Sequence, residues 1–448
     1  MHIKIKKGLD INLQGVAAKP QSVSGLAQVM PELVAVYPDD FPGFVPKVSV
    51  KEGDTVKAGD PLLFHKLNPE IKLVSPVSGT VKAVVRGERR KIIRVEVVPD
   101  PASAQDRLMF APAADFKTAI MNSGLWCMMR QRPYDVVPDP SKQPRDIFVT
   151  AFDSSPLAPH LELAVADADA DAELAAGVQA LKALTAGKVY ICVPEGTPLK
   201  PVAGAEWVTV SGPHPCGNPG PQIAAVAPVN KGETVWTLDI VTLSKIGQLA
   251  MKKSVSPVDI VTVAGPEVAH PEYVKTVAGA DVASLLKGRM NAVDGKRRVI
   301  SGSVLTGESV GENGFLHYPY RQISVIRDGS DVDEFMGWAN PGFNKLSTKR
   351  SVLGHFFGHR RFSPDARING GHRAMILSGE YDRVLPMDIM GEYLIKAILS
   401  RDIDRMEQLG IYEVAPEDFA LPEFVDTSKL ELQKIVREGL DYLRREVE

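Results

Sequence analysis

The clearest hydrophobic pattern in this chain lies between residues 48 and 81. The first half of the stretch, residues 48–64, reads VSVKEGDTVKAGDPLLF, and the second half, residues 71–81, reads IKLVSPVSGTV. Apolar and polar residues alternate in both halves, and glycine–aspartate pairs interrupt the first. This pattern is typical of short strands joined by tight turns. The stretch therefore predicts a sandwich of short strands with a hairpin between its two halves.

A helical period appears further along and predicts an α/β unit between residues 145 and 250. Residues 147–151 and 189–193 are short apolar runs, and Leu174, Val178 and Leu181 recur between them at the spacing of one helix face. Strand, helix and strand in this order favour a Rossmann-like parallel sheet. The loop after the first strand lacks GxGxxG, and the chain has no GxxxxGKS/T, so no nucleotide site is predicted.

The rest of the chain first returns to strands and then becomes helical. Residues 257–330 show strand patterns with a short helix at 280–286 and resemble the β-grasp domain that binds soluble ligands, although Glu272 stands where that pattern has a glycine. Residues 345–448 are expected to be mostly helical, and Ser428 and Glu431 predict a capping box for the last helix. The residues expected to face inward are Ile389, Tyr393, Ala397 and Leu399 in an earlier helix and Leu432, Ile435, Leu440 and Leu443 in the last one.

The 48–81 stretch resembles the biotinyl/lipoyl carrier fold through EGDTVKAGDPL in its first half and SPVSGTV in its second. In such a carrier, the hairpin between the halves presents a lysine for covalent attachment. The attachment position falls here on Asn68, in the tip 67–69, and asparagine has no amine to acylate. We therefore expect the biotinyl/lipoyl-like sandwich without its swinging-arm chemistry.

These patterns together predict an α+β multidomain protein, as a length of 448 residues also suggests. We expect N-terminal strands and the biotinyl/lipoyl-like barrel sandwich over residues 1–110. A Rossmann-like α/β domain is expected over residues 111–255, a β-grasp domain over 256–340 and a C-terminal helical domain over 341–448.

Composition narrows the classes of function. The net charge of −3 gives no general attraction to nucleic acid, so no nucleic-acid partner is expected. The three cysteines, Cys127, Cys192 and Cys216, form no CxxC pair, which excludes a disulfide framework and a cluster held by four local thiolates. No signal peptide and no membrane-spanning run are expected. The protein is expected in the cytoplasm or on the cytoplasmic face of a membrane.

Aromatic and cationic residues are concentrated in one short stretch, although only 6% of the chain is aromatic. Trp126, Arg130, Arg132 and Tyr134, here called the aromatic–cationic patch, would suit a planar ligand through cation–π contacts and a tyrosine hydrogen bond. A helix over about residues 116–130 is expected to carry the start of this patch. The alternative, favoured because most aromatic side chains are core, is that the tryptophan and tyrosine are buried and the arginines solvated.

Two other places have residue types suited to metal or nucleophile chemistry. The rigid loop SGPHPCGNPGP contains His214 and Cys216, for which a structural role is favoured because no second ligand pair is in range. His355 and His359 are four residues apart, with His372 downstream, but glycines weaken a helix there and the glutamate of HExxH is absent. No catalytic or metal-binding residue is therefore predicted, and no cofactor-binding residue outside the aromatic–cationic patch.

Several longer motifs follow one another along the chain: IKKGLDI, SPVSGTV, NSGLWCMMRQRPYDVVP, GPHPCGNPG, RVISGSVLTG, NGGHRAMI, YDRVLPMDIM and LPEFVDTSK. Together they resemble the NqrA family, a subunit family of the sodium-translocating NADH:quinone oxidoreductases, from about residue 3 to the C-terminus. That family is distantly similar to RnfC and to the flavin-carrying NADH-binding subunit of respiratory complex I. Those relatives bind FMN with a GxGGAGFPT loop, where this chain has Leu125 and Trp126. Many family members also carry two cysteines in the stretch that corresponds to residues 421–429, which has none here.

The resemblance implies a complex that oxidises NADH, passes electrons through flavins and an iron–sulfur centre in other subunits, reduces quinone to quinol and moves Na+ out of the cell. This chain would have no cofactor, would be inactive alone and would lie at the cytoplasmic face of the bacterial inner membrane, docked chiefly on the membrane-embedded NqrB. The aromatic–cationic patch would lie near the quinone path. The alternative is a stand-alone ligand-binding or carrier-like protein with no redox role.

Overall fold

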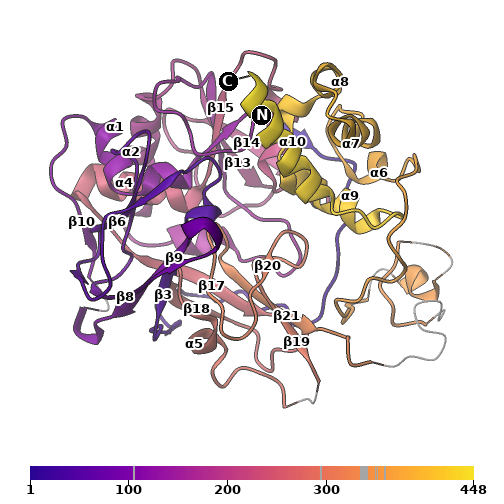
Figure 1. The fold of residues 1–448 in the computed structure, drawn as a ribbon, viewed down its shortest axis with the longest axis horizontal. Helices are drawn as coiled ribbons and strands as arrows, with labels where there is room; N and C mark the ends of the chain where they lie inside the picture. Colours follow the sequence, from indigo (N-terminus) through magenta and orange to yellow (C-terminus); the bar gives the residue numbers. More distant parts are fainter. Residues whose placement is uncertain are drawn as a thin grey trace.

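Three sheet-containing units and a group of C-terminal helices make up the computed structural model of this chain (Figure 1). The structure describes residues 1–103, 106–292, 295–332, 342–348, 350, 352–357 and 360–447. None of the helices in these ranges combines the length with the apolar run that a bilayer crossing needs.

The predicted sandwich is confirmed as two small antiparallel sheets, drawn in indigo and purple in Figure 1. The first sheet has the order β3 (Val34–Val36), β9 (Ile92–Pro99), β8 (Gly79–Arg86) and β5 (Thr55–Val56). The second sheet has the order β4 (Pro46–Val48), β6 (Pro61–His65) and β7 (Lys72–Val74). Leu62, Leu63 and Val95 are fully buried and belong to one hydrophobic cluster. Gly53 and Gly59 have positive φ in the predicted turns, a backbone conformation that glycine adopts at little cost. The hairpin tip between β6 and β7 contains Asn68, also as predicted.

A six-stranded, largely parallel sheet forms the second unit and confirms the predicted α/β class. Its order is β1-β14-β13-β12-β15-β11, from His2–Lys4, Glu206–Ser211, Val189–Pro194, Asp146–Thr150, Val235–Asp239 and Arg130–Arg132; only β11 is antiparallel. Alternate side chains of β12 face opposite layers. Ile147 and Val149 join the core of α2 (Ala170–Lys182) and α4 (Ile240–Lys252), whereas Phe148 joins that of α3 (Pro219–Val226).

The helix predicted over residues 116–130 is wrong in its second half. Helix α1 covers only Phe116–Asn122, and its N-cap Asp115 accepts a hydrogen bond from the Thr118 amide at 2.7 Å. Gly124 follows with φ +82°, which turns the chain out of the helix into a 3-10 turn, η4 (Leu125–Met128), and then into β11.

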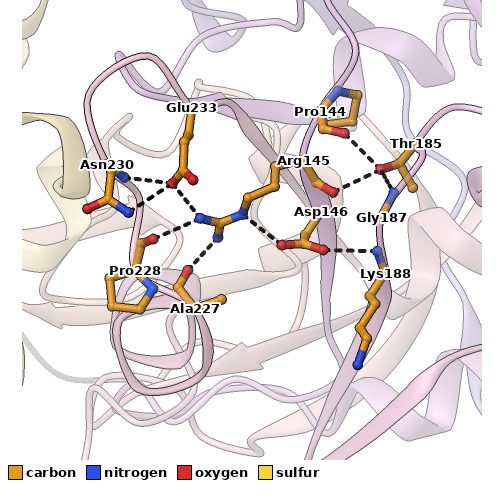
Figure 2. Close-up of polar contacts among 10 residues, drawn as sticks. All are labelled: Pro144, Arg145, Asp146, Thr185, Gly187, Lys188, Ala227, Pro228, Asn230 and Glu233. Carbon is orange, nitrogen blue, oxygen red and sulfur yellow. Dashed lines mark hydrogen bonds and ion pairs between the residues drawn. The ribbon is translucent and has the colours of Figure 1, made fainter.

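An arginine clamp fastens the loop before β15 to the start of β12 (Figure 2). The Arg145 guanidinium donates to the carbonyls of Pro228 and Ala227, at 3.0 and 2.7 Å, and to Asp146 at 2.8 Å. It also pairs with Glu233, whose carboxylate accepts from the Asn230 amide. The clamp lies at the amino ends of the strands. Open α/β sheets bind ligands at the carboxyl ends, so the clamp stabilises the edge that does not bind ligands.

A mixed sheet forms the third unit. Its order is β2-β18-β17-β21-β19-β20, from Ala27–Gln28, Glu272–Val277, Val258–Ala264, Gln322–Arg327, Arg297–Ser301 and Glu308–Ser309. The short helix α5 (Val282–Leu286) lies where residues 280–286 predict one, and its N-cap Asp281 accepts from the Ser284 amide. Strand β10 (Leu108–Met109) pairs with β16 (Ser254–Val255), beside the second and third units.

The predicted helical character of the C-terminal region begins later than residue 345. In the described part of residues 342–380, the regular structure is one 3-10 turn, η7 (Leu353–Phe357). The helices are α6 (Tyr381–Val384), α7 (Gly391–Ser400), α8 (Ile403–Gln408), α9 (Ala420–Val425) and α10 (Leu432–Val447). They share a core to which Ile11, Leu13 and Tyr134 also contribute.

In α10, the predicted inward positions Leu432, Leu440 and Leu443 are buried, and Ile435 is half-buried. Two other expectations for these helices are wrong. Tyr393 and Leu399 point to solvent because the apolar residues of α7 nearly encircle it, and the face made of Leu394, Ile395 and Ile398 packs inward instead. The capping box does not form, since the Ser428 hydroxyl donates to the Ala374 carbonyl.

Candidate functional site

A cavity of about 120 Å³ lies where the barrel sandwich, the second unit and the third unit meet. Its wall is mostly apolar and includes Val36, Leu73, Leu125 and Leu316. The polar residues in the wall include Asp40, Lys245, Asp259, Tyr318 and Arg321. An apolar cavity with a few converging polar groups is the usual form of a small-molecule site. We call it the junction cavity.

Two cations and two carboxylates form a balanced network at one end of the junction cavity. Lys245 on α4 lies 2.8 Å from Asp259 on β17, and Arg321 lies 2.6 Å from Asp239 at the end of β15. Burial raises the pKa of Asp259, but Lys245 and Arg321 outweigh it, so the pKa falls below its usual value. Asp259 therefore stays ionised, and Lys245 and Arg321 present N–H donors near the cavity.

A buried histidine–aspartate pair joins the barrel sandwich to the third unit at the same cavity. His317 Nδ1 lies 2.7 Å from Asp40 Oδ1, and the Tyr318 amide donates to Asp40 Oδ2 at 2.9 Å. Burial opposes charge on His317, but Asp40 outweighs this effect and raises the histidine pKa. The Tyr37 ring lies 4.1 Å from the His317 ring, measured between centroids. The pair therefore links the two units with a hydrogen bond that depends on protonation.

Arg130 is the member of the aromatic–cationic patch that comes nearest to the junction cavity. Its guanidinium lies 5.4 Å from the Tyr318 ring centroid and donates to the Asp40 carbonyl at 2.7 Å. The Tyr318 ring stacks on Phe41, and its hydroxyl donates to the Met128 carbonyl at 2.6 Å. Arg130 thus packs behind the aromatic wall through cation–π contacts with the Phe41 and Tyr318 rings of the protein itself.

The other three members of the patch are buried in different places. Trp126 is fully buried, donates from Nε1 to the Pro138 carbonyl at 2.8 Å and packs edge-on against Trp236. Tyr134 is buried against Tyr412. The favoured alternative is therefore confirmed for these two aromatic residues. It is wrong for Arg132, whose side chain is 1% exposed. The structure does not bring the four side chains together on one surface.

Arg132 holds the C-terminal helices to the second unit. It donates to Asp418 at 2.8 Å, to Glu417 at 3.1 Å and to the Glu413 carbonyl at 2.7 Å. Asp418 is fully buried, and burial raises its pKa more than Arg132 lowers it. A single cation therefore serves two neighbouring carboxylates.

The carboxyl edge of the parallel sheet, where such folds bind dinucleotides, is filled by the protein's own side chains. A Cβ placed on Gly220, in the first turn of α3, would come within 2.1 Å of Asp418 Oδ1. A carboxylate of the chain thus occupies the helix N-terminus, where a ligand phosphate would otherwise bind. The start of α3 therefore leaves no room for a ligand phosphate.

The loop SGPHPCGNPGP is buried and tied to its neighbours. His214 Nδ1 lies 2.9 Å from Ser154 Oγ, which also accepts from the Gly217 amide. Burial raises the pKa of Cys216 to about 11, so its thiol stays protonated and is a poor nucleophile. Within the described residues, no three His, Cys, Asp or Glu side chains are grouped as metal ligands. His359 of the predicted histidine pair lies outside the described residues.

Sequence reasoning missed the polar residues of the junction-cavity wall, Asp40, Lys245, Asp259, Tyr318 and Arg321, and also His317, which pairs with Asp40. They come from three units, and Asp40 and His317 are 277 positions apart. No local motif marks any of them, so no signal in a single sequence brings them together.

Family models describe most of this chain. The models match residues 3–100 as the NqrA N-terminal barrel-sandwich hybrid domain, residues 111–255 as the NqrA second alpha/beta domain and residues 260–312 as the NQRA C-terminal domain. Among solved structures, an NAD+-reducing nickel–iron hydrogenase in the H2-reduced state aligns with 68% of this chain and 55% of that chain, at 12% identity and a TM-score of 0.34, too weakly to compare folds.

Curated relatives match over nearly the full length, and all carry the name of the A-type subunit of Na(+)-translocating NADH-quinone reductase. The protein of Klebsiella pneumoniae (strain 342) is 37% identical over 454 residues, which cover 99% of this chain and all of the relative. That of Photorhabdus laumondii is 36% identical, with the same coverage. That of Rhodopirellula baltica is 35% identical and covers 99% of this chain and 98% of the relative. This chain therefore belongs to the NqrA family of Na(+)-translocating NADH-quinone reductase subunits.

Proposed function

We propose that this chain is the NqrA component of a complex that oxidises NADH, reduces quinone to quinol and moves Na+ out of the cell. The observation that carries the proposal is identity of 35–37% over 99% of the chain to relatives named as that component. On its own we expect the chain to be inactive, because in this proposal the flavins and the iron–sulfur centre that carry the electrons belong to other subunits.

Within that complex, we propose a docking role without a bound cofactor. The chain lies at the cytoplasmic face of the bacterial inner membrane, chiefly on the membrane-embedded NqrB, and flavins and an iron–sulfur centre belong to other subunits. Leu125 and Trp126 support this role, because they are buried where a flavin phosphate would need bare backbone amides. The stretch 421–429 supports it as well, since it contains no cysteine.

We also propose finer fold assignments for two units. The strands of the order β14-β13-β12-β15 are all parallel. Successive strands are added on one side of β12 up to β14, and β15 is then added on its other side, which supports a Rossmann-like sheet for the second unit. The mixed sheet that carries α5 supports a β-grasp assignment for the third unit.

A second proposal concerns the quinone path. We propose that a quinone headgroup reaches the junction cavity, behind which Arg130 packs. Apolar walls suit the ring, and the charged N–H groups of Lys245 and Arg321 are suitable donors for quinone carbonyl oxygens. In this proposal, Trp126, Arg132 and Tyr134 shape the wall indirectly through packing.

Purification through a tag on this chain tests the docking role. We expect gently solubilised membranes to yield the chain together with membrane subunits and a flavin-carrying NADH dehydrogenase subunit, identified by mass spectrometry. The isolated chain should be colourless. Recovery of the chain alone contradicts membership of the complex, whereas stoichiometric flavin on the isolated chain contradicts only the cofactor-free role.

Filling the junction cavity tests the quinone proposal. Val36→Trp places a large side chain in the cavity and should weaken binding of a short-chain quinone at least ~10-fold, because a ligand cannot share space that is already packed. Quenching of tryptophan fluorescence measures the binding. Val84→Trp, in the same sheet but away from the cavity wall, is the matched control. Equal affinities for the wild type and both variants would exclude this cavity.

A further inference from the structure

The segment 342–379 differs in charge from the rest of the chain. It contains seven basic residues and one acidic residue, Asp365, which gives a net charge of +6, whereas the whole chain has a net charge of −3. The basic residues are Lys345, Lys349, Arg350, Arg360, Arg361, Arg367 and Arg373. Such a concentration marks a surface that attracts anions, although the whole protein does not.

Several of the described arginines in this segment have no carboxylate partner among the described residues. Arg367 pairs with Asp365 at 2.6 Å and so satisfies the single carboxylate of the segment. Within the described part of the chain, the side chains of Arg350, Arg361 and Arg373 have no carboxylate partner. The Arg360 guanidinium lies over the Phe357 ring, 4.7 Å from its centroid. Several cations are therefore available to an external anionic partner.

Large apolar side chains are exposed in the same segment. Phe343, Phe356, Ile368, Ile376 and Leu377 are each between 46% and 65% exposed. The rings of Phe343 and Phe357 lie 6.1 Å apart, so the aromatic residues gather beside η7. Apolar side chains surrounded by arginine and lysine are the composition that binds the boundary between lipid headgroups and acyl chains.

Backbone hydrogen bonds anchor the segment at three points. The Phe362 amide donates to the Asn12 carbonyl at 2.9 Å, the Ala366 amide to the Arg327 carbonyl at 3.0 Å and the Arg373 amide to the Ser428 carbonyl at 2.9 Å. Figure 1 shows the segment in orange at the margin of the molecule, beneath the C-terminal helices. The described part of the segment is therefore tied to the rest of the molecule at these three residues.

We propose that the described residues of the segment 342–379 bind the surface of a membrane that contains anionic lipid. Phosphate headgroups meet the arginines that lack a carboxylate partner, and the exposed phenylalanine, isoleucine and leucine side chains enter the headgroup–acyl boundary. Lipid suits this segment better than a nucleic acid does, because aliphatic Ile368, Ile376 and Leu377 offer no stacking surface for bases. This site is separate from the junction cavity and from the docking role, so the intact isolated chain is sufficient to test it.

Vesicle co-sedimentation of the full chain tests the proposal. Vesicles of phosphatidylcholine with a quarter phosphatidylglycerol should bind the chain, and binding should weaken as salt rises. The triple variant Arg360→Gln/Arg361→Gln/Arg373→Gln should lower the partition coefficient ~100-fold, since each basic residue near an anionic surface contributes roughly 1 kcal/mol and 1.4 kcal/mol is tenfold. The double variant Ile376→Ser/Leu377→Ser should lower it about tenfold through lost apolar burial.

The triple variant Lys51→Gln/Lys57→Gln/Lys66→Gln is the matched control, because it removes three exposed cations from the barrel sandwich. It should bind as the wild type does. Equal binding to vesicles of pure phosphatidylcholine would overturn the role of charge. Unchanged binding of both segment variants would overturn the site. If no vesicle binding occurs and the segment variants instead lose their protein partners in the tagged purification, the surface is a protein interface and the lipid proposal is wrong.

Discussion

Arg132→Ala is expected to lower the free energy of unfolding by about 3–5 kcal/mol, as removal of one partner from a buried ion pair usually does. The variant would leave Asp418 without its cation in a place that is closed to solvent. It would also leave the Glu413 carbonyl without its donor. Urea denaturation followed by circular dichroism measures the loss.

The pH dependence of this variant separates a charge effect from lost packing. Burial raises the pKa of Asp418 in the folded protein, and without Arg132 the main group that opposes that rise is gone, although the Ala415 amide still donates to the carboxylate. A carboxyl whose folded pKa is raised binds its proton more tightly when folded, so its stabilising effect is present at low pH and is lost as pH rises. The variant should therefore regain stability on acidification. Arg383→Ala, which removes an exposed arginine paired with Glu380, should cost less than ~1 kcal/mol. If Arg132→Ala and Arg383→Ala lowered the free energy of unfolding by similar amounts, burial of the Arg132–Asp418 pair would not explain the effect.

His317→Ala is expected to lower the free energy of unfolding by about 3 kcal/mol at pH 6, because it leaves Asp40 buried without its cationic partner. The same change removes the ring that packs against Tyr37. The barrel sandwich and the third unit should then separate more easily. Hydrogen exchange should rise first in the strands that line the junction cavity.

The effect of His317→Ala should shrink as pH rises. Asp40 raises the histidine pKa above its usual value near 6.5, so the folded state holds the proton more tightly than the unfolded state does. The stability that comes from this pair is complete below about pH 6.5 and is lost as pH rises through the folded pKa. Unfolding free energies of wild type and variant should therefore converge as pH is raised from about 6.5 through the folded pKa of the histidine. A constant difference over that range would show that His317 contributes through packing alone.

Local patterns predicted the local structure of this protein well. The barrel sandwich followed from alternating residues and glycine turns, because strand period and turn chemistry depend on neighbours in sequence. The strands Asp146–Thr150 and Val189–Pro194 followed from short apolar runs for the same reason. Helix α7 was harder, since apolar residues nearly encircle it and the sequence alone did not select the buried face.

The candidate site could not be predicted, because the residues that contact one another in it are far apart in the sequence. Arg132 looked like a solvated arginine, and it is buried because Asp418, 286 positions later, returns to meet it. Asp40 and His317 carry no local signal, and they form a pair because two units fold against each other. Trp126 was placed in the core by the general tendency of aromatic residues, which requires no knowledge of its partner.

The first 28 residues supply strands to two different sheets, β1 beside β14 and β2 beside β18. During synthesis, residues 2–4 leave the ribosome about 200 positions before their partner strand. At roughly 5–20 residues per second, this delay lasts about 10–40 s. The barrel sandwich has all of its strands by then and is free to form first. Strands β1 and β2 therefore pair with their partner strands late. Their pairing completes the sheets of the second and third units after the barrel sandwich has been able to fold.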